Sequence, residues 1–178
     1  RVCKEWRQRI PDFHMSVNMS YEQIKDLSFL SFVDDCLCRY EMPPDAMILE
    51  LTESRIVGDL KFVNEQFNAF RSRGIQIAMD DFGTGYSSLS SLKNLSCDIV
   101  KIDRAFVTRI LENQFDQKLV EYTVELCHSI GMTTCIEGVE RQEEYDCLTR
   151  ICKTDTVQGY LFGRPEPQAI FEKKFLRM

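Results

Sequence analysis

Polar and charged side chains follow six short apolar runs of this sequence, each near the end of its run. The runs are MSVNMS, MILELTES, IQIAMDDFG, CDIVKID, MTTCIEGVE and TVQGYLF, and the residues are Asn18, Glu50, Asp80 with Asp81, Lys101, Glu137 and Gln158. Carboxylates gathered at one edge of a sheet would repel one another and raise one another's pKa, a penalty that divalent cations remove. Because the available ligands are oxygen atoms, the pattern favours Mg²⁺ or Mn²⁺.

The carboxylate of one of the adjacent residues Asp80 and Asp81 can point between two cations, while the carboxylate of the other points at the second cation. Two cations roughly 3.5–4 Å apart can bind a bridging hydroxide and hold a phosphodiester for in-line attack. The ammonium of Lys101 could orient the nucleophile or offset charge on the phosphate. These residues therefore predict a metal-dependent phosphodiesterase, although spacing alone also permits other metal-assisted chemistry, such as a lyase that uses Lys101 as its base.

Taken singly, each of these residues also has an ordinary structural interpretation as a turn, cap, bulge or surface ion-pair residue, and the same holds for Glu53 in ELTES and Asp103 beside Lys101. Their recurrence at successive strand ends favours a functional site. The two histidines, His14 and His128, fall inside strand and helix patterns, so we do not expect either to bind a metal.

The elements that must position these residues alternate between strand and helix patterns. Strands are expected at 13–19, 47–51, 75–79, 97–102, 132–136 and 156–161. One helix should begin at Ser20, where Gln23 completes a capping-box pattern, and should carry Ile24, Leu27, Phe32 and Leu37. Further helices are expected from about 59 to 73, from 140 to about 152 and from 165 to 175. A helix ending at Gly131 should bury one face made of Phe115, Leu119, Tyr122, Leu126 and Ile130.

Six strands alternating with helices predict an α/β fold with a parallel sheet. An open, doubly wound sheet is one solution, and a TIM-like (β/α)8 barrel is the other. Only the barrel gathers the carboxyl ends of all its strands around one pocket. The polar residues at every strand end therefore favour an incomplete barrel with six of its eight strands present.

The composition limits the partners of this chain. Its 178 residues suit a single domain, and 44% hydrophobic residues allow a real core. A net charge of −6 argues against a DNA- or RNA-binding groove. No run of 18 apolar residues is present, so no membrane contact is expected from this segment. The eight cysteines are expected to be free thiols in a reducing cytoplasm. Because the chain begins with Arg1, we expect an upstream portion.

The quoted stretches also carry a resemblance to a known family. VNMS, ELTES, DDFGTGYSSL, KIDRAF, EGVE and QGYLFGRP, in this order between Phe13 and Phe171, resemble the signature stretches of EAL domains, the bacterial cyclic-di-GMP phosphodiesterases. The resemblance implies a barrel of the EAL type over residues 1–178 and hydrolysis of cyclic-di-GMP to linear pGpG with two Mg²⁺ or Mn²⁺ ions.

The resemblance also implies a role for each candidate residue. Asn18, Glu50 and Asp80 would bind one ion, and Asp80 and Asp81 would hold the second. Lys101 would contact the attacking water, Glu137 would complete the shell of metal and water, and Gln158 would position that shell. Glu53 would anchor the loop 82–88, which in the family couples the site to a dimer partner. Asp103 would lie nearby as a supporting acid.

The Glu-Ala-Leu motif that names the family, with its metal-binding Glu and phosphate-binding Arg, should lie upstream of Arg1 and is not in this sequence. We therefore expect the isolated chain to be weakly active or inactive and its parent protein to be active. We also expect the chain to cover its open edges by dimerising, swapping segments or rearranging. A non-catalytic module that binds cyclic-di-GMP or a protein partner is the alternative. The family also suggests a homodimer, upstream sensory or GGDEF domains, and a cytoplasmic location with a parent protein that could be membrane-tethered.

Overall fold

The computed structural model describes residues 1–52, 60–83 and 89–176. Its centre is one sheet of six parallel strands, and their order in the sheet, β1 to β6, is their order in the sequence. The strands are β1 (Met15–Asn18), β2 (Met47–Thr52), β3 (Gln76–Phe82), β4 (Ile99–Ile102), β5 (Thr133–Ile136) and β6 (Thr156–Val157).

Helices connect the strands and flank the sheet. The α-helices are α1 (Val2–Arg7), α2 (Tyr21–Lys25), α3 (Ser28–Arg39), α4 (Leu60–Arg71), α5 (Leu89–Asn94), α6 (Gln114–Ser129), α7 (Gln142–Ile151) and α8 (Gln168–Phe171). Short turns of other helix types are η1 (Pro44–Ala46), η3 (Arg104–Phe106) and the π-helical η4 (Glu172–Leu176).

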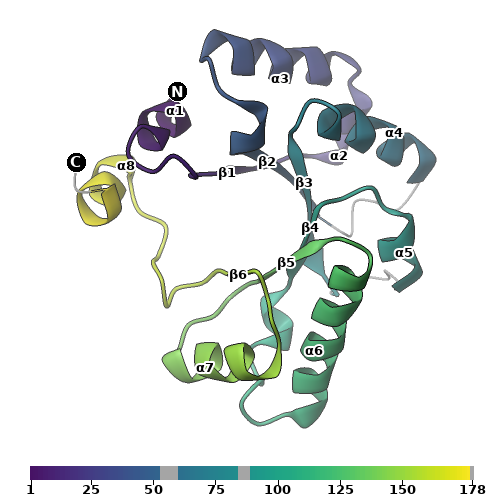
Figure 1. Ribbon diagram of the computed structural model, residues 1–178, viewed down its shortest axis with the longest axis vertical. Helices are drawn as coiled ribbons and strands as arrows, with labels where there is room; N and C mark the ends of the chain where they lie inside the picture. The colour runs from purple at the N-terminus through teal and green to yellow at the C-terminus, as the bar shows by residue number, and fades with distance from the viewer. Residues whose placement is uncertain (53–59, 84–88, 177–178) are drawn as a thin grey trace.

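The strand order decides between the two architectures that the sequence allowed. A doubly wound sheet reverses its strand order at a switch point, whereas here each strand lies beside the next one in the chain. Figure 1 shows the sheet curled, with α3 to α7 around its convex side and an opening between β1 and β6. The fold is an incomplete TIM-like α/β barrel, open between β1 and β6, which confirms the predicted fold class.

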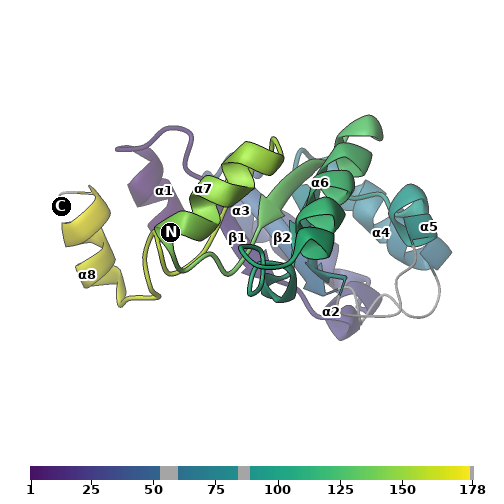
Figure 2. The ribbon, with the colours of Figure 1, turned by 90° about the horizontal axis from the view of Figure 1, so that it is seen from below.

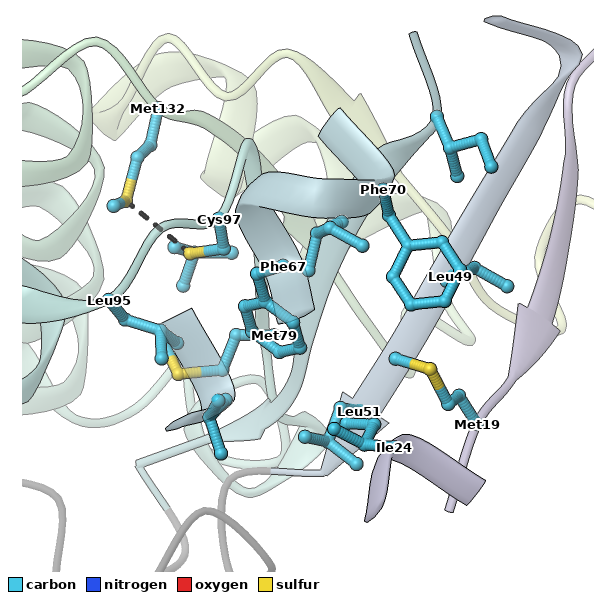
Figure 3. Close-up of a cluster of buried hydrophobic side chains, with 14 of the residues drawn as sticks. Met19, Ile24, Leu49, Leu51, Phe67, Phe70, Met79, Leu95, Cys97 and Met132 are labelled. Atoms are coloured by element: carbon cyan, nitrogen blue, oxygen red, sulfur yellow. Dashed lines mark hydrogen bonds between the residues drawn. The ribbon is translucent and has the colours of Figure 1, made fainter. Parts of the chain in front are cut away.

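Alternating side chains separate the two faces of the sheet, because successive residues of a strand point to opposite sides. Leu49, Leu51 and Met79 point to the convex side, where Figure 3 shows them packed with Phe67 and Phe70 of α4. The alternate residues of the strands point into the curled interior and line a cavity of about 1070 Å³. Examples are Ile48 and Glu50 of β2, Ala78 of β3, Lys101 of β4 and Cys135 of β5. The polar residues Glu50 and Lys101 therefore lie on the concave face of the sheet.

A second core lies between the sheet and the pair α6 and α7, and it corrects one prediction. The face of α6 that packs inward consists of Val120, Thr123, Val124 and Cys127. The predicted face is mostly outside, because Phe115 and Tyr122 are 70% and 60% exposed, Ile130 is also exposed, and Leu119 and Leu126 are half-buried. The helix carries two apolar stripes, and the stripe of smaller residues packs against the sheet.

The helix predicted from Ser20 to Leu37 is two helices. The capping box of Ser20 and Gln23 opens α2 as predicted. The chain then turns extended at Asp26, whose carboxylate accepts the backbone N–H of Ser28 and so begins α3. This local hydrogen bond competes with continuation of the first helix. Leu27, expected to be buried, is 74% exposed at the junction, and Phe32 is also exposed.

The last strand and the last helix are both shorter than predicted. The strand β6 has two residues, after which irregular hydrogen bonds of Val139 with Gln158 and Leu161 replace the ladder. The helix α8 begins after Pro167 rather than at Pro165, and η4 extends it. The remaining strand and helix predictions agree with the structure to within a few residues.

Two aspartates fasten the amino-terminal ends of the strands in the same way. Asp98, before β4, accepts the backbone N–H of Ile77 and pairs with Arg71 at the end of α4. Asp155, before β6, accepts the backbone N–H of Thr134 and pairs with His128 at the end of α6. The sequence separations are identical in the two sets, 27 residues to the helix partner and 21 to the amide. The half-barrel therefore contains one anchoring device twice.

The first and last helices meet across the opening of the sheet. The rings of Trp6 in α1 and Phe171 in α8 stack with centroids 4.6 Å apart, and Phe13 packs edge-on against Trp6. The indole N–H of Trp6 donates to Glu172 at 2.9 Å. Figure 2 shows α1 and α8 together at one end of the molecule. This aromatic contact lines one side of the cavity.

All eight cysteines are free thiols, and Cys97 lies 3.7 Å from the sulfur of Met132 in the core. Figure 3 shows this sulfur contact beside Leu95. Within the described ranges, the helices lack the length and apolar character that crossing a membrane requires.

Candidate functional site

The predicted polar residues converge at the carboxyl ends of β2, β3, β4 and β5. The centre of the cluster is the ammonium of Lys101, which is buried and 5% exposed. Its Nζ donates a hydrogen bond to Glu50 Oε2 at 2.8 Å and makes ion-pair contacts of 2.9 Å with Asp80 Oδ1 and 2.8 Å with Glu137 Oε1. Curvature of the sheet thus brings carboxylates from three separate strands onto one lysine of a fourth.

A bulge places both Asp80 and Asp81 at this site. In a regular strand these neighbours would point to opposite faces. The register of β3 against β4 shifts between Met79 and Phe82, and Asp81 adopts a left-handed backbone conformation with φ of 56°. This conformation is strained for a residue other than glycine and is common at functional sites. As a result, ligand oxygens of Asp80, Asp81 and Glu137 all lie within 4.8 Å of one another.

The backbone after Glu137 is tightly constrained. Gly138 has φ of +73°, and a Cβ at this position would lie 2.3 Å from Cβ of Arg104 and 3.2 Å from its Cα. The next turn is held by the buried carboxylate of Glu144, which accepts the backbone N–H groups of Glu140 and Arg141. The positive φ and the close approach to Arg104 both require glycine directly after Glu137.

The electrostatics follow from three carboxylates around one ammonium. Burial lowers the pKa of Lys101, but the contacts with Glu137, Glu50 and Asp80 outweigh it, so the net pKa lies above its ordinary value and the ammonium stays charged. Burial raises the pKa of Glu137 above its ordinary value, although Lys101 opposes this effect. The cluster holds more negative than positive charge and favours an additional cation.

The donor set fits a hard divalent cation. Asp80, Asp81 and Glu137 offer oxygen ligands, and in the part of the chain that the structure describes they form the one group of this kind. Asp80 Oδ1 is buried, and although it lies 2.9 Å from Lys101 Nζ, the contact is not aligned as a hydrogen bond, so the oxygen has no hydrogen-bond partner in the described ranges. A short but misaligned ion pair of this kind leaves lone pairs of Asp80 Oδ1 available to another cation.

The structure places the other residues considered from the sequence at several different positions. Asn18 is the register partner of Glu50 on β1, and its side chain is exposed. Gln158 follows β6 and lines the cavity. Asp103 caps η3 by accepting the backbone N–H of Ala105 at 2.8 Å. Glu53 and most of the loop 82–88 lie outside the described residues. His14 lines the cavity, and His128 pairs with Asp155.

Two contributors were not anticipated from the sequence. The Glu-Gly pair that follows a strand pattern could have indicated the positive φ of Gly138, but not its close approach to Arg104, which is distant in the sequence. Glu144 gave no signal, because an acidic residue in the first turn of a helix is ordinary.

The opening of the cavity also exposes Tyr160, over whose ring the guanidinium of Arg164 lies at 4.7 Å from the centroid.

Comparison with known proteins gives consistent similarities. The sequence matches the EAL domain family over residues 1–165. It is 36% identical over 159 residues to the bifunctional diguanylate cyclase/cyclic di-GMP phosphodiesterase MucR of Pseudomonas aeruginosa, covering 88% of this chain and 23% of MucR. The chain thus spans about a quarter of the length of the curated relatives it matches.

Solved structures agree with the sequence matches. The PaMucR phosphodiesterase in complex with c-di-GMP superposes with a TM-score of 0.84 and 32% identity, over 96% of this chain and 70% of the other. A manganese and cyclic-di-GMP complex of Klebsiella pneumoniae BlrP1 gives a TM-score of 0.84 and 28% identity, over 92% of this chain and 42% of the other.

Proposed function

This chain belongs to the EAL domain family, and from that premise we propose that the protein containing it hydrolyses cyclic-di-GMP to linear pGpG at the cluster around Lys101. One observation carries the proposal: Glu50, Asp80 and Glu137, each within two residues of the carboxyl end of a different strand, meet at one buried ammonium, with Asp81 beside them. An arrangement that leaves buried negative charge in excess stabilises no fold by itself. It is suited to binding cations and a phosphodiester.

We propose that Asn18, Glu50 and Asp80 hold one divalent cation, and that Asp80, Asp81 and Glu137 hold the second. Mg²⁺ and Mn²⁺ are the candidates, and BlrP1, whose complex contains manganese and cyclic-di-GMP, supports this choice. When bound, such cations lower the pKa of a coordinated water and polarise the phosphodiester. The donor oxygens within 4.8 Å of one another support their assignment as ligands.

The remaining side chains would act on the substrate and the attacking water. The ammonium of Lys101 lies among the carboxylates, where it would orient the water and offset negative charge that develops on the phosphate. Gln158, directly after the edge strand β6, would position the same water through its amide. The Glu144 contact and Gly138 would keep Glu137 in place, since a displacement of about 1 Å can cost catalysis on the order of a hundredfold.

We further propose the assembly that the family suggests. Glu53 would anchor the loop 82–88 toward a dimer partner, and Asp103 would support the site from its turn. The similarity to the bifunctional protein MucR supports fusion to a diguanylate cyclase (GGDEF) domain. A sensory domain, and a cytoplasmic location in a parent protein that could be membrane-tethered, complete this proposal. Size-exclusion chromatography of the full-length protein with light scattering tests the dimer. A monomeric mass at micromolar concentration would reject the dimer.

The reaction is tested by incubating the full-length protein with cyclic-di-GMP and Mn²⁺ and following the products by liquid chromatography. We expect conversion to pGpG and its loss in Glu137→Gln, with Glu140→Gln, an exposed neighbour, retaining activity. Tight binding of cyclic-di-GMP by calorimetry without turnover would contradict hydrolysis and identify the protein as a non-catalytic binding module. Absence of both binding and turnover would reject the site.

A further inference from the structure

The ammonium of Lys101 is in ion-pair contact with three carboxylates. A lysine ammonium has three N–H donors, and three carboxylate oxygens, one from each of Glu50, Asp80 and Glu137, lie at 2.8–2.9 Å. The side chain is 7% exposed, so water does little to screen these contacts. The ammonium therefore occupies the point at which the carboxylates of three strands are closest together.

The same carboxylates form part of the candidate cation site. Two of the three side chains in the group within 4.8 Å, Asp80 and Glu137, are also partners of Lys101, whereas Asp81 is not among its ion pairs. A divalent cation drawn to Asp80, Asp81 and Glu137 would stand close to an ammonium that the same oxygens attract. Like charges at such distances repel strongly when they are buried.

We propose that Lys101 is an internal counter-ion that competes with the divalent cation for Asp80 and Glu137, and so sets the metal affinity of the site. The ammonium gives up these two carboxylates when the cation binds and keeps its hydrogen bond to Glu50. The unfavourable alignment of the Asp80 contact and the hydrogen bond to Glu50 fit this division. The inference rests on the proposed function, because it concerns the same metal site.

Lys101 could instead strengthen metal binding by holding the carboxylates together, and this effect has the opposite sign. If the ammonium mainly organises the carboxylates, its removal would let them move apart or take up protons, and metal binding would weaken. If it competes for them, its removal would strengthen metal binding while turnover is lost. The direction of the change in affinity therefore distinguishes the two roles.

The experiment is a titration of the chelator-treated full-length protein with Mn²⁺ alone, in which free Mn²⁺ is followed by electron paramagnetic resonance. We expect Lys101→Met to bind Mn²⁺ at least tenfold more tightly than the wild type, and Lys101→Arg to bind no more tightly. Arg104→Met is the matched control, because Arg104 is an exposed cation against Gly138 without an ion pair to these carboxylates. It should stay within twofold of the wild type.

A second measurement reports on the counter-ion without metal. The chelator-treated Lys101→Ala protein should melt several degrees below the wild type, and methylammonium chloride should recover part of the loss, whereas tetramethylammonium chloride at equal ionic strength should not. If Lys101→Met or Lys101→Ala does not fold without metal, Lys101→Gln replaces it, because the amide keeps a donor that can reach Glu50 without carrying the charge.

The outcomes separate this inference from the proposed function. Unchanged or weaker Mn²⁺ binding by Lys101→Met, with normal binding by the wild type, would overturn the counter-ion and leave the phosphodiesterase intact. An equal gain in affinity for Arg104→Met would also overturn it, because the effect would then be general electrostatics. Failure of the wild type and of every variant to bind Mn²⁺ would overturn the metal site, and this inference with it.

Discussion

Lys101 and Glu50 form a 2.8 Å ion pair across an intervening strand, although 51 residues separate them in the sequence. Their strands, β4 and β2, are both neighbours of β3 and do not pair with each other. The contact therefore requires the sheet to curl and both side chains to point to its concave face. The site therefore forms only when the sheet is curved, and the Lys101–Glu50 contact in turn joins two strands of the curved sheet.

The first prediction concerns Glu50→Gln, which keeps the shape of the side chain and removes its charge. We expect a loss of stability of about 1–2 kcal/mol, because the charge-assisted hydrogen bond to Lys101 becomes a neutral one. Hydrolysis of cyclic-di-GMP by the full-length protein should fall at least a hundredfold. Chemical denaturation and product analysis measure the two effects. Glu65→Gln, on the exposed side of α4, is the control and should change neither; equal behaviour of the two variants would contradict the role of Glu50.

The second prediction compares two glycines with similar backbone conformations. Gly138 and Gly131 have φ of +73° and +80°, but a Cβ at Gly138 would collide with Arg104, whereas one at Gly131 would have no atom within 4 Å. Alanine at Gly131 should cost about 1 kcal/mol from backbone strain alone. Alanine at Gly138 should cost about 2 kcal/mol more and reduce turnover, because it displaces Glu137. Equal losses of stability in denaturant titrations would show that the close approach to Arg104 is relaxed in solution.

The third prediction is a dependence of stability on pH at the amino-terminal ends of the strands. Burial raises the pKa of Asp155, but hydrogen bonds from His128 and Thr134 outweigh it, so the net pKa lies below the ordinary value. A carboxyl with a lowered pKa stabilises the folded state above its unfolded pKa of about 4, and this contribution is lost as the pH falls through the folded value.

Asp155→Asn should therefore be less stable than the wild type by about 1 kcal/mol at pH 7. The difference should shrink as the pH falls below about 4, as measured by urea denaturation across this range. Asp146→Asn, exposed on α7, is the matched control, and it should stay within about 0.5 kcal/mol of the wild type. A difference for Asp155→Asn that grows toward acid pH would be the wrong sign for this account.

The fourth prediction concerns the contact between the first and last helices. Phe171→Ala removes the ring that stacks on Trp6 at 4.6 Å. Trp6 is the one tryptophan of the chain, so the fluorescence of the isolated chain reports directly on this contact. Its emission should shift to longer wavelength as water reaches the indole, with a loss of about 1–3 kcal/mol of stability. Phe115→Ala, which shortens an exposed ring on α6, should leave the emission unchanged. A spectrum of Phe171→Ala identical to that of the wild type would mean that the two helices do not meet in solution.

Much of the architecture could be predicted because the local signals were strong. Six apolar runs ending in polar residues gave the parallel strands, and the requirement that these ends share one pocket gave the barrel instead of the open sheet. Lys101, Glu50, Asp80, Asp81 and Glu137 were all identified from their positions near the ends of apolar runs, and the structure brings them together. Their individual roles stay predictions until metal and substrate binding are measured.

The errors have local physical causes. The inward face of α6 was assigned from its largest apolar residues, whereas the smaller Val120 and Val124 pack against the sheet. The break at Asp26 follows from one side chain capping the next helix, a competition that hydrophobic spacing does not reveal. The bulge that turns Asp81 to the same side as Asp80 depends on the register with β4, which a single sequence does not encode in any short pattern.

The most direct test is an anomalous diffraction measurement at the manganese absorption edge on crystals of the full-length protein grown with Mn²⁺. The account predicts two anomalous peaks roughly 3.5–4 Å apart, bounded by Asp80, Asp81 and Glu137, with Glu50 and Asn18 on the side of the first. Crystals in which no manganese lies within reach of Asp80 and Glu137, with Lys101 still bound to both, would contradict it.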